Sequence, residues 1–300
     1  MFDFRVRIHR GARQIGGTCV ELEAQCQRIV LDLGLPLDAE KASEALLPDI
    51  PGLKFSEPAL RAIVLSHGHV DHWGLTPYVG SDIPIAVGAA TARILRAAAP
   101  FVPTPFIFQV SYELVDRKPL EIGPFRVTPY LVDHSAFDAY ALLVEAGGRR
   151  LFYSGDIRGH GRKASLFERL LAHPPRDVHA MLMEGSSLGR LGPDEHFPTE
   201  TEIEEKFVER FRAAPGFVAV SASAQNIDRL VSIYRACKRT GKTLVLDLYA
   251  MEILNATGNK NIPGPGWPNL AFYVPEYPIV FTPMLWERSA ERQSCCSGQP

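Results

Sequence analysis

The sequence has 300 residues, which is enough for one large domain or two smaller ones. Its formal net charge of −2 excludes a protein that binds nucleic acid or an anionic membrane through bulk positive charge, so an anionic substrate must be held locally. The five cysteines form no CxxC pair, the N-terminus lacks the apolar core of a signal peptide, and no stretch approaches the roughly 20 apolar residues of a membrane span. We therefore expect a cytoplasmic protein with free thiols and no membrane partner.

Short β-rich runs separated by glycine-containing turns open the chain. The pattern predicts strands at residues 6–9, 19–23, 28–32 and 62–65. Asp32 ends the third run, and its simplest interpretation is a turn cap.

Four potential metal ligands follow the run at 62–65 within six positions. They are His67, His69, Asp71 and His72. In an extended segment alternate side chains point the same way, so His67, His69 and Asp71 face one point while His72 turns in beside them. Imidazole and carboxylate ligands suit zinc best, with manganese or iron as alternatives, and the spacing therefore predicts a metal site.

Two further ligand candidates follow later strands. The pattern predicts a helix at 89–98 and strands at 83–87, 109–115, 125–132, 139–145 and 150–154. His134 and Asp156 come directly after two of these strands. Alone, either would be interpreted as a turn residue, but loop residues at one sheet edge can reach a common site.

The His67-x-His69-x-Asp71-His72 stretch resembles the signature of the metallo-β-lactamase fold, and His134 and Asp156 match its later ligand motifs in order and context. The resemblance implies an α/β fold in which two β-sheets are flanked by helices (αββα), and a hydrolase whose zinc-bound water has a pKa lowered to about 7. It implies two zinc ions, with manganese as an alternative, and Asp71 and His72 as catalytic residues. The implied ligands are His67, His69 and His134 for one ion, Asp71 and His72 for the other, and Asp156 as a bridge.

Residues 132–140 and 153–156 narrow the resemblance to the β-CASP branch, which contains nucleases such as ribonuclease J. The implied substrate is RNA or single-stranded nucleic acid, cleaved at phosphodiester bonds, and because the branch often dimerises a homodimer is a further expectation. In this family an Asp-x-Gly element supports the histidine loop, which makes Asp32 a supporting residue. The branch inserts a second domain that begins with a strand ending in an acidic residue, and Glu184 matches that position.

The residues after Glu184 fit such an insert. A helix at 199–214 with an N-cap at Thr199, strands at 217–221 and 243–247, and a helix at 226–239 imply a parallel sheet. Ser223 and Asn226 lie at the end of the first strand, where they either bind substrate or only cap the helix. We expect one strand or two at 271–280. The predicted domains are residues 1–190 (metal-binding), 191–280 (partial β-CASP-like) and 281–300 (disordered tail).

The loop after Asp156 carries three cations, Arg158, Arg162 and Lys163. They either bind substrate phosphates or form a solvated basic turn, and phosphate binding predicts activity that falls with rising salt. His9, His173, His179 and His196 are interpreted as structural or exposed.

One departure from the β-CASP pattern concerns the C-terminal part. Members of the branch carry further histidine motifs there, one of which completes the second metal site, whereas no histidine follows His196. We expect either a truncated chain or a chain with an incomplete second site. Two alternatives to a nuclease therefore remain, a small-molecule hydrolase acting on a thioester, lactone or lactam, and an inactive homologue that binds metal without turnover.

Overall fold

The computed structural model describes residues 4–55, 57–102, 109–192 and 194–274. The chain divides into two compact units, Met1–Ala92 with Phe108–Glu202, and Arg93–Ile107 with Ile203–Pro300. The predicted tail at 281–300 and the end of the strand region predicted at 271–280 lie outside the described residues. No helix in the described ranges is long and apolar enough to cross a membrane.

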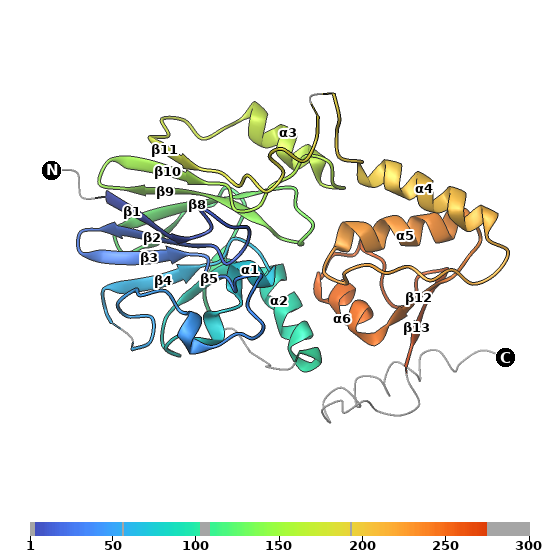
Figure 1. The fold of residues 1–300 in the computed structure, drawn as a ribbon, viewed down its shortest axis with the longest axis horizontal. Helices are drawn as coiled ribbons and strands as arrows, with labels where there is room; N and C mark the ends of the chain where they lie inside the picture. Colours follow the sequence, from blue (N-terminus) through green and yellow to red (C-terminus); the bar gives the residue numbers. More distant parts are fainter. Residues whose placement is uncertain (1–3, 56, 103–108, 193, 275–300) are drawn as a thin grey trace. The chain divides into compact units, whose positions relative to one another are not determined.

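The first unit contains two β-sheets (Figure 1). The larger sheet has the order β1-β2-β3-β4-β5-β6, antiparallel from β1 to β3 and parallel from β3 to β6. Its strands are β1 (Phe4–Arg10), β2 (Cys19–Ala24), β3 (Gln27–Leu31), β4 (Leu60–Val64), β5 (Ile85–Gly88) and β6 (Val110–Leu114). The smaller sheet has the order β11-β10-β9-β8-β7 and is antiparallel except for the β10–β11 pair. Its strands are β7 (Leu120–Ile122), β8 (Phe125–Leu131), β9 (Tyr140–Ala146), β10 (Arg149–Tyr153) and β11 (Ala180–Leu182).

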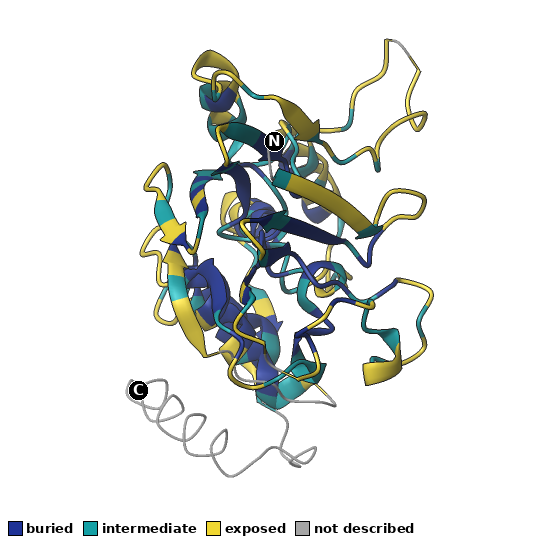
Figure 2. Ribbon diagram, turned by 90° about the vertical axis from the view of Figure 1, so that its left-hand side faces the viewer, coloured by how far each residue is buried: buried dark blue, intermediate teal, exposed yellow. Residues whose placement is uncertain are grey.

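The main hydrophobic core lies between these two sheets. Alternate residues of β2, β3 and β4, such as Leu22, Ile29 and Val64, pack with Val127 and Leu142 of the smaller sheet. The outer face of the smaller sheet is covered by helix α3 (Ala164–Ala172), whose Leu170 joins a second cluster. In Figure 2 the buried strands are dark blue and most connecting loops are yellow. The sandwich confirms the predicted α/β fold class.

Two helices follow strands of the larger sheet in the chain. The short helix α1 (Val70–Trp73) comes after β4, and α2 (Ala89–Ala98), with the predicted bounds, comes directly after β5. Asp138 accepts hydrogen bonds from the backbone N–H groups of Ala90 and Thr91 at 2.8 and 3.0 Å, so a residue from a distant loop satisfies the first turn of α2.

The second unit is built from α4 (Glu200–Ala213), α5 (Ile227–Arg239), α6 (Leu248–Ala256) and a parallel pair of strands, β12 (Leu244–Asp247) and β13 (Leu270–Tyr273). Val208 and Phe211 of α4 pack on Ile233 and Cys237 of α5. The same two helices are joined by Glu204, which is buried and accepts from Arg235 and Arg239.

The strand predicted at 217–221 does not form. Its residues have high β-propensity, but a strand also needs a hydrogen-bonded neighbour, and in the described part of this unit β12 pairs with β13. Helices α3 and α6 and strand β7 were not predicted.

Candidate metal centre

The candidate centre lies where β4 ends and α1 begins. Ser66, His67 and Gly68 follow β4, and His69 is the extended N-cap residue of α1. Asp71 and His72 are therefore helical, which corrects the prediction that His67, His69 and Asp71 alternate along one extended segment. The helical turn carries His72 back toward the buried side, where it is 2 % exposed.

Asp32 is the hydrogen-bonding centre beneath this loop. It is fully buried, and its backbone adopts φ +57°, a conformation that Asp tolerates better than most residues. Its carboxylate accepts from the backbone N–H and the hydroxyl of Ser66, each at 2.7 Å, and from the Tyr153 hydroxyl at 2.5 Å. The fourth contact joins Oδ2 to Nδ1 of His72 at 2.7 Å, which directs Nε2 of His72 away from Asp32.

Three imidazoles form the first group of potential ligands. One nitrogen each of His67, His69 and His134 lies within 4.8 Å of the other two. Nε2 of His134 lies 3.1 Å from Nδ1 of His69. Burial, and then the neighbouring histidines, lower the pKa of His67 well below its usual value, and burial likewise lowers the pKa of His134. Both shifts favour the neutral imidazole, which is the form that binds metal.

His67, His72 and Asp156 form the second group, again with donor atoms within 4.8 Å. Nε2 of His72 lies 3.3 Å from one Asp156 oxygen, and Nε2 of His67 lies 4.0 Å from the other. Burial disfavours protonation of His72, but the charge of Asp32 and the hydrogen bonds with Asp156 and Asp32 outweigh it and raise the pKa to about 10. Burial alone would raise the pKa of Asp156, and the hydrogen bond with His72 lowers it instead.

The residues fit a divalent metal. Among the residues that the structure describes, Nε2 of His67 is buried without a hydrogen-bond partner, and an orphaned buried nitrogen is costly unless a ligand satisfies it. The donor set of imidazoles and one carboxylate suits zinc or manganese.

Asp71 lies at the edge of the centre rather than inside either group. Its Oδ2 is 3.9 Å from Nε2 of His72, and its side chain is 17 % exposed. Its backbone oxygen accepts from Thr18, and a Cβ at Gly34 would lie 1.6 Å from that oxygen, so position 34 admits only glycine. The close approach fixes α1 against the loop after β3.

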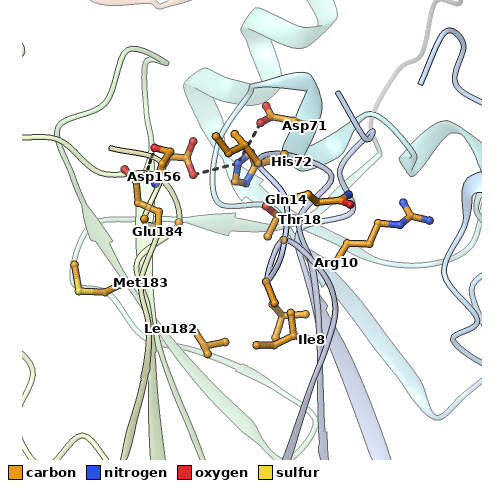
Figure 3. A pocket seen from close by; sticks show the side chains of 18 of the residues that line it. Ile8, Arg10, Gln14, Thr18, Asp71, His72, Asp156, Leu182, Met183 and Glu184 are labelled. Carbon is orange, nitrogen blue, oxygen red and sulfur yellow. Dashed lines mark hydrogen bonds and ion pairs between the residues drawn. The ribbon is translucent and has the colours of Figure 1, made fainter. Parts of the chain in front are cut away.

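A cavity of about 610 Å³ opens beside the second group (Figure 3). Asp71, His72 and Asp156 lie at one end, and the side chains of Ile8 and Met183 line its walls. The centre is therefore accessible to a ligand from this side.

Glu184 supports the loop that follows Asp156. One carboxylate oxygen accepts from the backbone N–H of Ile157 at 3.2 Å, and the other accepts from the Ser186 hydroxyl and backbone N–H. Its own N–H donates to Ser154 Oγ at 3.0 Å. These contacts join the loop after Asp156 to the residues that follow β11, and the supporting role of Glu184 stays a prediction.

The candidate substrate residues lie in two places. Nε of Arg158 is 3.5 Å from the buried carboxylate of Asp133, and Arg162 reaches the backbone oxygen of Glu200, so this loop is packed rather than a freely solvated turn. In the second unit, Asn226 is the N-cap of α5 and accepts from Arg229 N–H at 3.1 Å, while Ser223 Oγ accepts from Gln225 N–H. The capping interpretation of Asn226 is thus realised.

Sequence reasoning missed three residues around the centre: Ser66 contacts His67, Tyr153 contacts Asp32, and Asp133 contacts the loop after Asp156. Ser66 directly precedes His67, and Tyr153 ends the strand that leads to Asp156, so adjacency to the motifs was the available signal. Their partners could not be derived in the same way. The Tyr153 hydroxyl, for example, donates to Asp32, which is 121 positions away in the sequence.

Comparison with known proteins agrees with this geometry. A model of the "Beta-lactamase superfamily domain" matches residues 28–177, half of the chain. The chain is 27 % identical over 262 residues to a protein named Ribonuclease J from Mycobacterium tuberculosis (strain CDC 1551 / Oshkosh), covering 79 % of this chain and 43 % of that protein. A Ribonuclease J of Helicobacter pylori (strain ATCC 700392 / 26695) is 25 % identical over 228 residues, covering 73 % and 33 %.

The chain therefore belongs to the β-lactamase superfamily, and its domain has the metallo-β-lactamase fold. It spans less than half the length of these curated relatives. A crystal structure of a protein of unknown function from Enterococcus faecalis V583 matches with a TM-score of 0.74 at 20 % identity, covering 94 % of this chain and 73 % of that one, which supports the fold alone.

Proposed function

We propose that this chain is a hydrolase that cleaves phosphodiester bonds of RNA or single-stranded nucleic acid with two divalent ions, preferentially zinc. The observation that carries the proposal is the pair of His/Asp groups that share His67 at one end of the sandwich. The similarity to curated relatives named Ribonuclease J supports RNA as the substrate in this proposal.

In this proposal each ligand residue has a defined role. His67, His69 and His134 would hold one ion and Asp71 and His72 would hold the other, while Asp156 offers one oxygen on the side of His67 and one on the side of His72. Bound divalent ions supply Lewis acidity that makes an attacking water more acidic and stabilises charge on the phosphoryl oxygens.

The protein's own groups orient the reactants. Asp32 fixes the ring of His72 through Nδ1, so that Nε2 faces the cavity side. Asp71 lines the cavity at the same end, where its carboxylate can accept a proton from the attacking water. Arg162 and Lys163 follow Asp156 and supply positive charge for substrate phosphates, whereas Arg158 faces the buried carboxylate of Asp133.

The test is cleavage of an end-labelled single-stranded RNA by zinc-loaded protein, beside His67→Ala and the exposed-histidine control His173→Ala. We expect cleavage by the wild type and by His173→Ala, and none by His67→Ala. Cleavage by His67→Ala at the wild-type rate would contradict the mechanism. If none of the three proteins cleaves RNA, RNA is not the substrate of this chain.

The apolar wall of the cavity favours a second candidate, hydrolysis of a small thioester, lactone or lactam. Ile8, Val20, Leu182, Met183 and Leu188 all line the cavity beside the candidate centre. Turnover of a thioester or lactam that is lost in His67→Ala, without RNA cleavage, would identify this activity instead.

A further inference from the structure

Asp133 is a buried carboxylate that the proposed chemistry does not use. It directly precedes His134 and is 0 % exposed. It lies in the loop after β8, and that loop is closed by a hydrogen bond from Val132 N–H to Ala139 O at 2.9 Å.

Three contacts join Asp133 to the loop that follows Asp156. Its backbone oxygen accepts from Arg158 N–H at 2.8 Å, and its Oδ2 accepts from Gly161 N–H at 2.7 Å. Its Oδ1 faces Nε of Arg158 at 3.5 Å. One residue therefore ties the loop of one candidate ligand, His134, to the loop of another, Asp156.

Gly161 packs closely against this contact. A Cβ at Gly161 would lie 2.2 Å from Oδ1 of Asp133 and 2.6 Å from Nη2 of Arg158. The side chain of Arg158 is only 13 % exposed. A buried ion pair of this kind adds little to stability compared with apolar packing, and its best-attested use is to fix one arrangement of the chain.

We propose that Asp133 is a positioning residue that clamps the Asp156 loop to the His134 loop, and so sets the separation of these two metal ligands. This inference rests on the proposed metal-binding function but not on the choice of substrate. It predicts that metal affinity depends on Asp133 more strongly than folding does.

The test is a cobalt(II) titration followed by visible absorption, with thermal unfolding measured on the same proteins. Asp133→Asn keeps the size of the side chain but retains only one acceptor oxygen, so its amide N–H₂ group must face a donor, either Gly161 N–H or Arg158 Nε–H. We expect cobalt half-saturation to rise about 10- to 100-fold, as for other residues that hold metal ligands in place.

A matched control is Asp116→Asn. Asp116 likewise accepts from a backbone N–H (Leu131, 2.8 Å) and from an arginine (Arg169, 2.7 Å), but it joins β8 to α3 and neighbours no candidate ligand. We expect it to lower the unfolding temperature while leaving the cobalt titration unchanged.

Gly161→Ala reaches the same contact from the other loop, so the test survives if Asp133→Asn does not fold. The added methyl group displaces Asp133, and we expect the same direction of change in cobalt affinity. If the wild type binds cobalt and both variants bind it with the same affinity, the clamp is overturned while the proposed metal site stands. A wild type that binds no cobalt would overturn the proposed metal site and the clamp together.

Discussion

The loops of the first unit and the start of α5 in the second unit teach different lessons about polar residues that follow strands. In the first unit, His67, His134 and Asp156 come from three separate strand ends and converge within metal-binding distance. At α5, Asn226 and Ser223 accept hydrogen bonds from backbone groups three and two residues away. Long-range convergence separates a candidate site from a local cap.

The largest effect that sharpens this comparison is expected for Asp32→Asn. Asparagine also tolerates the φ of +57°, so the change isolates the lost charge and the lost acceptor under Ser66, His72 and Tyr153. We expect a loss of about 1–3 kcal/mol in the free energy of unfolding. Metal affinity should weaken about 10- to 100-fold.

The control for Asp32→Asn is Asp177→Asn, because Asp177 has the same left-handed backbone conformation with a side chain that is 85 % exposed. Chemical denaturation and metal titration of both variants measure the difference. Equal stability and equal metal affinity in the two variants would show that the Asp32 carboxylate neither stabilises the fold nor positions the metal ligands.

A smaller effect is expected for the basic loop. If Arg162 and Lys163 hold substrate phosphates, the rate of RNA cleavage at low substrate concentration falls as salt rises. The slope of log(kcat/KM) against log[salt] is then negative, and each Gln substitution should make it less steep by about 0.7 for single-stranded RNA. The measurement is kcat/KM at several salt concentrations. An unchanged slope in the double variant Arg162→Gln/Lys163→Gln would show that these two residues do not bind substrate phosphates.

The smallest effect is expected at α5. Asn226→Ala removes the side-chain acceptor for Arg229 N–H and should cost about 1 kcal/mol in the free energy of unfolding, whereas Asn226→Asp should retain the cap. RNA cleavage per folded molecule should be unchanged in both variants. A marked fall in kcat/KM for both would assign a substrate role to this helix start and break the comparison.

Most strands of the first unit could be predicted from the sequence because β-rich runs alternate with turn residues there. The candidate site could be predicted because histidine and aspartate follow several of these runs. Helix α2 has the predicted bounds, and the strands around the centre lie within one to two residues of their predicted positions. The helical placement of Asp71 could not be derived, since alternation assumes an extended chain and α1 starts one residue after His69. The predicted strand at 217–221 failed for a related reason, because strand pairing is decided by neighbours rather than by propensity.

Contacts between distant residues were the other limit. The bond between Tyr153 and Asp32 and the clamp between Asp133 and Gly161 depend on how two sheets and two loops meet. No local pattern encodes those distances. The predicted domain boundaries and the assignment of each ligand to an ion remain predictions.

The most direct test of the central claim is the number of zinc ions bound per chain, measured by titration of metal-free protein with elemental analysis of the product. The account predicts two ions for the wild type and loss of at least one in His67→Ala, because His67 belongs to both groups. A single ion in the wild type would contradict the two-ion centre and favour a chain that binds metal without turnover.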